Sequence, residues 1–305
     1  MAKIIYPKKF GSDKLECLLS DFEKHIKETD RGKSVRSYLG DVKRFIEWGT
    51  QKYSSFTVRG VSSLDLVEYR EYLQKNGGRN KTGAAPATVN RALISLKLFF
   101  AWLLQQDHVK DNPVENIKQV AVASTLAPKW LDRNQQAALM RVVRDGGSIR
   151  DEAIIGLMLH AGLRVSEVCS LRHEDIDLSA RAGNVSVTGK GNKYREVPLN
   201  ITVRKILEPW MDVNSSNPLF PNRYGNGIST RGVFKLVDEY AYQAKLEDVS
   251  PHTLRHSFCK NAIDRGIPID QVAALAGHSS LDITKRYTTP SKDDLQAAVE
   301  RMSWE

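Results

Sequence analysis

Apolar residues recur at helical spacing along most of this 305-residue chain, whereas only one pair of short segments alternates as strands do. In the first third, the amphipathic segments are Asp13–Lys27, Ser34–Tyr53, Ser63–Leu73 and Thr88–Gln106, the third capped by Ser62 or Ser63. Such spacing places the apolar side chains of each segment on one face of a helix. The first third is therefore predicted to be a small helical bundle.

The strand-like pair lies in the second half of the chain. Asn184–Thr188 and Tyr194–Leu199 alternate apolar and polar residues around the polar run GKGNK, which predicts a β-hairpin. The surrounding segments again have helical spacing. The predicted fold class is mainly α, with a small β-sheet or hairpin in the second half.

Length and helix breakers divide the chain. A chain of 305 residues is long for one small domain and can bury two cores. Asn112-Pro113 and Ala127-Pro128 bracket a stretch of small residues typical of a connector. We predict an N-terminal helical domain over residues 1–118, a linker over 119–127 and a second domain over 128–305.

The composition of the chain limits which kind of partner it can bind and where in the cell it is expected. The formal net charge of +9 fits a polyanionic partner without identifying it. The three scattered cysteines do not suggest a disulfide framework. The N-terminus has no continuous apolar signal region, and no stretch approaches the 18 apolar residues of a membrane span. These features predict a cytoplasmic protein without a membrane segment.

The end of the chain gathers side chains suited to phosphoryl transfer. His252-Thr253-Leu254-Arg255-His256 is followed by Gly277-His278 and then by Tyr287. The planar guanidinium of Arg255 matches two oxygens of a phosphate. A tyrosine can be a covalent nucleophile, but its usual pKa of about 10 requires cationic or basic neighbours, and Lys285 and Arg286 precede Tyr287 directly.

Local signals place these residues on the predicted elements. Gly277 ends an apolar helix, and Ser279 or Ser280 begins another, so that Tyr287 is expected about two turns inside the second helix. Upstream, Gly162 breaks the helical run Asp151–Ala161. Arg164 then stands at the start of the next helix, where backbone N–H groups favour an anion.

Each residue also has an ordinary interpretation when taken alone. Arg164 could be a surface ion-pair partner, Lys190 in the GKGNK turn could be solvated, and Tyr287 is one of ten tyrosines. His252 and His256 have the spacing of a metal pair, but Thr253 replaces the glutamate of zinc protease motifs and Arg255 would repel a cation. His256 is interpreted as a packed or phosphate-supporting residue.

Taken in order, these motifs resemble the tyrosine recombinase, or phage integrase, family, with the two-domain organisation of Xer-like members. The motifs are Ala161-Gly162-Leu163-Arg164, Gly189-Lys190-Gly191-Asn192-Lys193, His252-Thr253-Leu254-Arg255-His256, Gly277-His278 and Tyr287. The resemblance covers 128–305 and, more weakly, the N-terminal part. It implies a SAM-like, core-binding N-terminal domain and an α+β catalytic domain. The implied catalytic set is Arg164, Lys190, His252, Arg255, His278 and Tyr287.

The resemblance also implies a reaction. A site-specific recombinase would cleave DNA through a 3′-phosphotyrosyl intermediate and a Holliday junction, without ATP, metal or cofactor. Arg164 and Arg255 would hold the phosphate, Lys190 would be the general acid, His252 would assist proton transfer, and His278 would donate a hydrogen bond to the phosphate. Two alternatives remain: a monomeric type IB topoisomerase, and a non-catalytic DNA-binding regulator.

Further contacts are expected around this set. Glu167 lies one helical turn after Arg164 and is predicted to orient nearby catalytic groups. The glycine-rich loop Asn76–Gly83 either follows a phosphate backbone or is a flexible connection. A terminal apolar stripe either packs on its own domain or, as the resemblance favours, docks on a neighbour in a homotetramer on double-stranded DNA. The predicted DNA-contacting residues are Lys81, Asn90, Arg91 and Lys97, and the stripe comprises Leu295, Ala298, Val299 and Met302.

Overall fold

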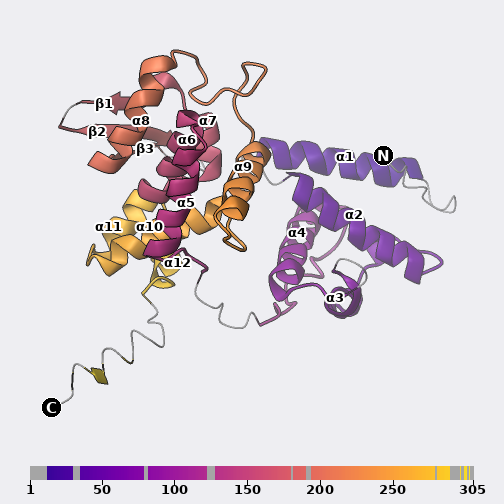
Figure 1. Cartoon of the computed structure of the whole chain (residues 1–305). Helices are drawn as coiled ribbons and strands as arrows, with labels where there is room; N and C mark the ends of the chain where they lie inside the picture. Colours follow the sequence, from indigo (N-terminus) through magenta and orange to yellow (C-terminus); the bar gives the residue numbers. More distant parts are fainter. Residues whose placement is uncertain are drawn as a thin grey trace. The chain divides into compact units, whose positions relative to one another are not determined.

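The structure is a computed structural model of the whole chain (Figure 1). It describes residues 12–29, 35–78, 82–121, 128–179, 181–189, 194–278 and 280–288, together with positions 296, 299, 300 and 302. The chain separates into two compact units, Met1–Ser124 and Thr125–Glu305, and each is described by itself. Residues 122–127 of the predicted linker lie outside the described residues, as do Leu295 and Ala298, two of the four residues of the terminal stripe.

The described residues of the N-terminal unit form four α-helices, as their apolar spacing predicts. A capping box between Ser62 and Asp65 starts its third helix, and Pro86 occupies the first position of its fourth. Aromatic side chains fill the core, with the Phe45 ring against Tyr69 at a centroid distance of 5.0 Å. The helices are α1 (Ser12–Glu28), α2 (Val35–Lys52), α3 (Ser63–Asn76) and α4 (Pro86–Gln105).

Helix α4 bears on the prediction that the chain has no membrane segment. It is long and apolar enough to pass a length and composition test for a membrane-spanning helix, with a mean hydropathy of 1.4. Most of its apolar side chains nevertheless lie inside the N-terminal unit, where Phe99, Phe100 and Leu103 are fully buried, whereas Ile94 and Leu104 are exposed. The hydropathy of α4 is therefore that of a core helix.

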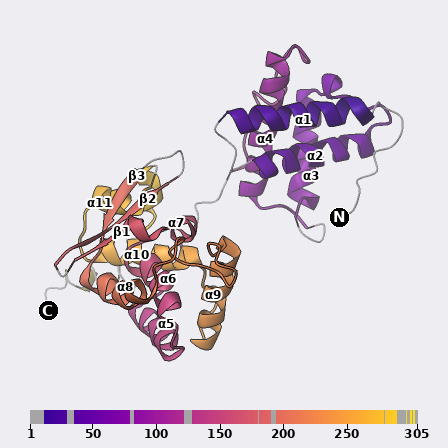
Figure 2. The same cartoon turned by 90° about the horizontal axis from the view of Figure 1, so that it is seen from above.

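The C-terminal unit is built around helix α6, which packs against α5, α7, α8, α9 and α10. In Figures 1 and 2, α6 lies between α8 and α9. From Ala153 to Leu159 every residue of α6 is buried, as expected for a helix with neighbours on all sides. The helices are α5 (Arg133–Asp145), α6 (Ile149–His160), α7 (Val165–Ser170), α8 (Ile201–Val213), α9 (Thr230–Gln243), α10 (Pro251–Asp264), α11 (Ile269–Ala276) and α12 (Leu281–Lys285).

A three-stranded antiparallel sheet completes this unit. The order is β1 (Ile176–Leu178), β2 (Gly183–Thr188) and β3 (Tyr194–Pro198), with Val185 opposite both Ile176 and Val197. The β2–β3 pair is the predicted hairpin, whereas β1 was not predicted because three residues are too few for a visible alternation. On β2, Gly183, Val185 and Val187 face the core in alternation.

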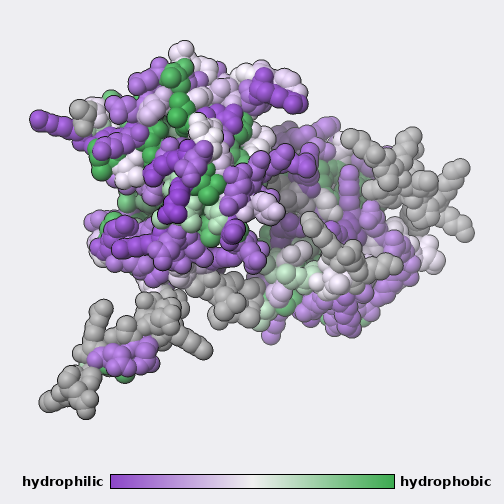
Figure 3. Space-filling view, in the orientation of Figure 1, coloured by the Kyte–Doolittle hydropathy of each residue, from purple (hydrophilic) through white to green (hydrophobic). Residues whose placement is uncertain are grey.

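A small apolar cluster joins α10, α11 and the end of α12. Its buried members are Cys259, Ala262, Val272, Ala276 and Tyr287. The surface of the C-terminal unit visible in Figure 3 is mostly hydrophilic, with smaller hydrophobic patches. The small cluster matters for function because it encloses the phenol that the sequence singled out.

Candidate active site

The break before α7 places Arg164. Gly162 has a φ of +68° and lies so close to Phe258 that a Cβ there would come within 2.3 Å of the ring. This left-handed turn ends the α6 segment, and Arg164 becomes the N-cap residue of α7. Glu167 accepts a hydrogen bond from the Arg164 backbone N–H and another from Arg164 Nη1, each at 2.8 Å. The predicted start of a helix at Arg164 is confirmed, and Glu167 holds the Arg164 side chain.

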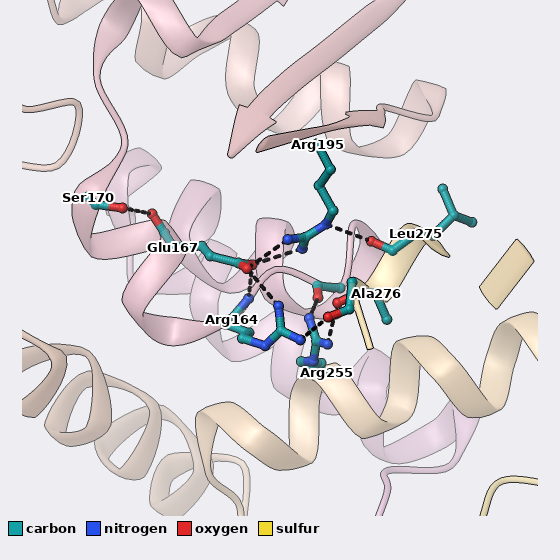
Figure 4. Close-up of polar contacts among 9 residues, drawn as sticks. Arg164, Glu167, Ser170, Arg195, Arg255, Leu275 and Ala276 are labelled. Atoms are coloured by element: carbon teal, nitrogen blue, oxygen red, sulfur yellow. Dashed lines mark hydrogen bonds and ion pairs between the residues drawn. The ribbon is translucent and has the colours of Figure 1, made fainter. Parts of the chain in front are cut away.

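Helix α10 brings Arg255 to the same place. Ser250 caps α10, and Pro251 occupies its first position. The Arg255 side chain is buried, and it donates hydrogen bonds to the carbonyl oxygens of Gly162 and Ala276 (Figure 4). Burial, followed by the nearby charge of Arg164, lowers the pKa of Arg255 to about 10, so the guanidinium remains charged near neutral pH.

Both arginines meet at the end of α11. Gly277 is the left-handed C-cap, with φ +63°, and its carbonyl oxygen accepts a hydrogen bond from Arg164 Nη2. The neighbouring carbonyl of Ala276 accepts from Arg255. Two guanidinium groups from separate helices therefore converge on consecutive peptide groups immediately before His278.

His278 is held between α12 and the tyrosine. Its Nδ1 lies 2.8 Å from the buried Thr284 hydroxyl, and its ring stacks on Tyr287 with a centroid distance of 6.3 Å and an interplanar angle of 11°. Burial, then the charges of Arg255 and Arg164, lowers the pKa of His278 to about 4. The imidazole is consequently neutral at pH 7.

Tyr287 lies after a helix and not inside one, so the expectation of two helical turns before it was wrong. Helix α12 ends at Lys285, and the Tyr287 backbone N–H bonds the Thr284 carbonyl in the following turn. Ser280 is the N-cap residue. The Tyr287 side chain is 1% exposed, and burial, with a smaller contribution from Cys259, raises its pKa above the usual value. A phenol in this environment is protonated and shielded from solvent.

The remaining predicted residues have different positions. His252 is exposed in the first turn of α10, with its ring 6.1 Å from that of Phe234 on α9. His256, one turn later, makes a hydrogen bond between Nδ1 and the Tyr287 hydroxyl. Burial, then the charges of His252 and Arg255, lowers the pKa of His256 to about 4. Lys190 lies outside the described residues, as does Lys81.

One residue at this site was missed by the sequence analysis. Arg195 on β3 donates two hydrogen bonds to Glu167, at 2.8 and 3.0 Å, and a third to the Leu275 carbonyl at 3.3 Å (Figure 4). Burial alone would raise the pKa of Glu167, but the hydrogen bonds from Arg195 and Arg164 reverse this effect and lower it. A signal was present in the strand alternation, because Arg195 shares the inward register of Val197.

The predicted DNA-contacting residues of α4 already have protein partners. Asn90 is buried, and its side-chain amide exchanges two hydrogen bonds of 2.8 Å with the Val120 backbone. Arg91 pairs with the buried Asp41 at 3.0 Å, and Lys97 pairs with the exposed Glu115 at 2.7 Å. Arg91 and Lys97 retain half-exposed side chains, whereas the Asn90 amide is occupied by the connection after α4.

Comparisons with known proteins match both units. Residues 129–294 match the phage integrase family, and residues 19–107 match the phage integrase N-terminal SAM-like domain. The tyrosine recombinase XerC of Myxococcus xanthus is 32% identical, over 94% of this chain and 97% of the relative. The XerC of Thermodesulfovibrio yellowstonii is 31% identical, over 88% of this chain and 90% of the relative.

Solved structures show the same fold. The XerH site-specific recombinase bound to a palindromic difH substrate matches 95% of this chain and 89% of its own, with a TM-score of 0.72 and 22% identity. A lambda integrase dimer bound to a COC′ core site matches 89% of this chain and 94% of its own, with a TM-score of 0.68 and 16% identity. With the family match across most of both units, the chain belongs to the phage integrase family and is a Xer-like tyrosine site-specific recombinase.

Proposed function

We propose that this recombinase cleaves and rejoins double-stranded DNA at specific core sites, with Tyr287 as the nucleophile. The observation that carries the proposal is the convergence of Arg164 and Arg255 on the Ala276 and Gly277 carbonyls beside the stacked His278 and Tyr287 rings. Two cations and a neutral imidazole, with a phenol beside them, are the groups that a displacement at a phosphodiester needs. The XerH and lambda integrase structures contain DNA substrates, which supports DNA as the partner here.

In the proposed step, Tyr287 Oη forms a bond to phosphorus while the bond from phosphorus to the 5′-oxygen breaks. The phenol loses its proton to a neighbouring base, and the leaving 5′-oxygen takes a proton from Lys190. A 5′-hydroxyl of another strand then attacks the 3′-phosphotyrosyl link and releases Tyr287. Because the bond energy is conserved in the link, the exchange through a Holliday junction needs no ATP.

The arginines would neutralise the charge that gathers on the phosphate oxygens. The Arg164 side chain is one-third exposed, so a phosphate can approach it from solvent, whereas Arg255 is buried. Bound DNA would replace the carbonyl partners of these side chains with phosphate oxygens of higher charge. Losing one such donor costs about 10²- to 10³-fold in rate in other enzymes.

His278 and His256 would act in their neutral forms, because burial lowers the pKa of each to about 4. If Thr284 donates its hydroxyl proton to His278 Nδ1, the His278 Nε2–H is left to donate to the phosphate. His252, exposed at the start of α10, would assist proton transfer. The hydrogen bond from His256 would hold Tyr287 in its buried position until DNA binds.

Because Tyr287 is buried, we propose that this arrangement precedes cleavage. Its phenol packs among Cys259, Ala262 and Val272, so it must leave this cluster to reach a phosphate. The turn after α12 is the segment that must move. We propose that DNA binding drives this movement, because phosphate attracts the cationic Lys285 and Arg286 that precede the tyrosine.

We also propose how the protomers assemble and which residues contact the DNA backbone. Strand exchange between two duplexes needs four active sites, so we propose a tetramer on DNA in which the C-terminal segment docks on a neighbouring protomer. In the N-terminal unit, Lys81, Arg91 and Lys97 are the proposed backbone contacts, and Asn90 is dropped because its amide is occupied. The proposed location is the cytoplasm.

Covalent capture tests the function directly. DNA bound from a random duplex pool would first identify a core site, and a labelled duplex carrying that site and a nick would then be incubated with protein in EDTA. Wild type should yield a denaturation-resistant adduct whose phosphotyrosyl peptide contains Tyr287, and Tyr287→Phe should yield none. An adduct from both proteins would place the nucleophile elsewhere.

A second assay separates recombination from relaxation. A supercoiled plasmid carrying two core sites should give recombinant circles with wild-type protein. A type IB topoisomerase would relax the plasmid and leave both sites in their original arrangement. Relaxation without recombinants would therefore favour the topoisomerase alternative.

A further inference from the structure

Arg195 lies within the site, where its side chain contacts Glu167 and the Leu275 carbonyl. It is on β3, five residues after Lys190, and its side chain is 16% exposed. Its two terminal nitrogens donate to the two oxygens of Glu167, at 2.8 and 3.0 Å, in a paired geometry. Its Nε donates to the Leu275 carbonyl at 3.3 Å. Two parallel hydrogen bonds fix the plane of a carboxylate as a single bond cannot.

The carboxylate that Arg195 fixes is the one that holds Arg164. Glu167 Oε1 accepts from both Arg195 Nη1 and Arg164 Nη1, each at 2.8 Å. Glu167 Oε2 accepts from Arg195 Nη2 and from the Arg164 backbone N–H. Glu167 itself is 3% exposed, so little water competes for these contacts. The orientation of the Arg164 guanidinium therefore depends on a carboxylate whose plane Arg195 sets.

Arg195 also packs on the other partner of Arg164. The Arg164 side chain reaches the Gly277 carbonyl, and a Cβ on Gly277 would lie 2.7 Å from the Arg195 guanidinium carbon. Arg195 thus binds Glu167, one partner of the Arg164 guanidinium, and lies next to Gly277, the other partner. A lysine could not reproduce this arrangement, because its single ammonium cannot span two carboxylate oxygens in a plane.

We propose that Arg195 is a positioning residue for DNA cleavage: through Glu167 it holds the Arg164 guanidinium where the charge of the scissile phosphate develops. This inference rests on the proposed function. Because Arg195 acts through Arg164, the loss of Arg195 should slow cleavage only when the phosphate carries a charge for Arg164 to neutralise. A misplacement of this kind can cost about 10²-fold in rate.

The test compares two versions of the nicked core-site duplex, one with a natural scissile phosphate and one with a neutral methylphosphonate. Single-turnover adduct formation is measured at saturating DNA for wild type, Arg195→Met and Arg195→Lys. Arg172→Met, at a two-thirds exposed arginine of the same unit, is the matched control. DNA affinity is measured separately by fluorescence anisotropy.

On the natural phosphate, we expect Arg195→Met to slow cleavage by about 10²-fold with little change in Kd, and Arg195→Lys to fall between it and wild type. On the methylphosphonate, Arg195→Met should come within a few-fold of wild type, because no phosphate charge remains for Arg164 to meet. Arg172→Met should match wild type on both substrates.

Several outcomes would overturn the inference. An equal defect on both substrates would mean that Arg195 serves only the general structure, and an unchanged rate on the natural phosphate would mean that it does not position Arg164. A further duplex carries a 5′-bridging sulfur, whose departure needs no general acid. Full rescue of Arg195→Met on this duplex would mean that Arg195 acts through the Lys190 hairpin. If Arg195→Met does not fold, the cleavage rates of Arg195→Lys on the natural phosphate and on the methylphosphonate test the inference instead.

An activity-independent readout separates this inference from the function itself. In a spectrum of protein with ¹⁵N-labelled arginine, the Arg164 Nε–H signal should be sharp in wild type and broadened in Arg195→Met. An unchanged signal would refute the positioning role even if no DNA were cleaved. Failure of the wild type to form an adduct, with the expected change in this signal, would count against the proposed function alone.

Discussion

Replacing Glu167 by glutamine should destabilise the C-terminal unit far more than its small change in shape suggests. The carboxylate accepts four hydrogen bonds, one from the Arg164 backbone and three from the two guanidinium groups, at 2.8 to 3.0 Å. The glutamine amide retains one oxygen and turns two N–H donors toward groups that also donate. At least two charged hydrogen bonds are lost, each worth about 1.5–3 kcal/mol.

The expected cost is about 3–5 kcal/mol, which is also the range for breaking one partner of a buried ion pair. With a urea dependence of about 2–3 kcal/mol per molar, the unfolding midpoint should fall by about 1–2.5 M. The unit should still fold, since domains of this size have about 5–15 kcal/mol of stability. The measurement is amide hydrogen exchange along a urea series, followed by mass spectrometry of peptides from α6, α7 and β3, which reports this unit separately.

Glu174→Gln is the matched control, because it makes the same substitution at an exposed carboxylate that pairs with Arg172 at 3.4 Å. It should change the free energy of unfolding by less than about 1 kcal/mol. A Glu167→Gln midpoint indistinguishable from that of Glu174→Gln would refute the reasoning. It would show that the buried carboxylate gains no more from its two arginines than a solvated one does.

Three further outcomes are expected. In urea unfolding, Gly277→Ala should lower the free energy of unfolding more than Gly266→Ala does. Both positions have positive φ, but only at Gly277 would the new Cβ meet Arg195. Equal losses of stability in the two variants would show that contact with Arg195 does not add to the cost. Ser257→Ala should lower the free energy of unfolding by about 1–3 kcal/mol, because the buried Ser257 hydroxyl accepts a hydrogen bond from the Leu131 N–H. A urea unfolding midpoint equal to that of wild type would contradict this prediction. The free energy of unfolding should fall as the pH drops from about 6.5 to about 4, because the unfolded chain protonates His256 and His278 at a higher pH than the folded chain does. His256→Gln should make this dependence of stability on pH less steep. An unchanged pH dependence in His256→Gln would exclude a contribution from His256.

Much of the fold followed from local patterns. The helical spacing, the serine caps at Ser62 and Ser280 and the left-handed glycine after α11 are readable because each depends on residues within one or two turns. The β2–β3 hairpin is local in the same sense. Strand β1 was missed because its identity depends on pairing with β2, and Tyr287 was placed inside a helix because its spacing did not reveal that α12 ends at Lys285.

By itself, the sequence determined the helices, the hairpin and the order in which Arg164, Arg255, His278 and Tyr287 appear. Only the tertiary structure decided which groups meet. The pairing of Arg195 with Glu167 spans 28 residues, and that of His256 with Tyr287 spans 31. Local periodicity carries no information about such contacts, because they depend on how β3, α7, α10 and α11 pack together. The burial of Tyr287 has the same origin: a tyrosine after a short helix becomes enclosed only where α10 and α11 supply its walls.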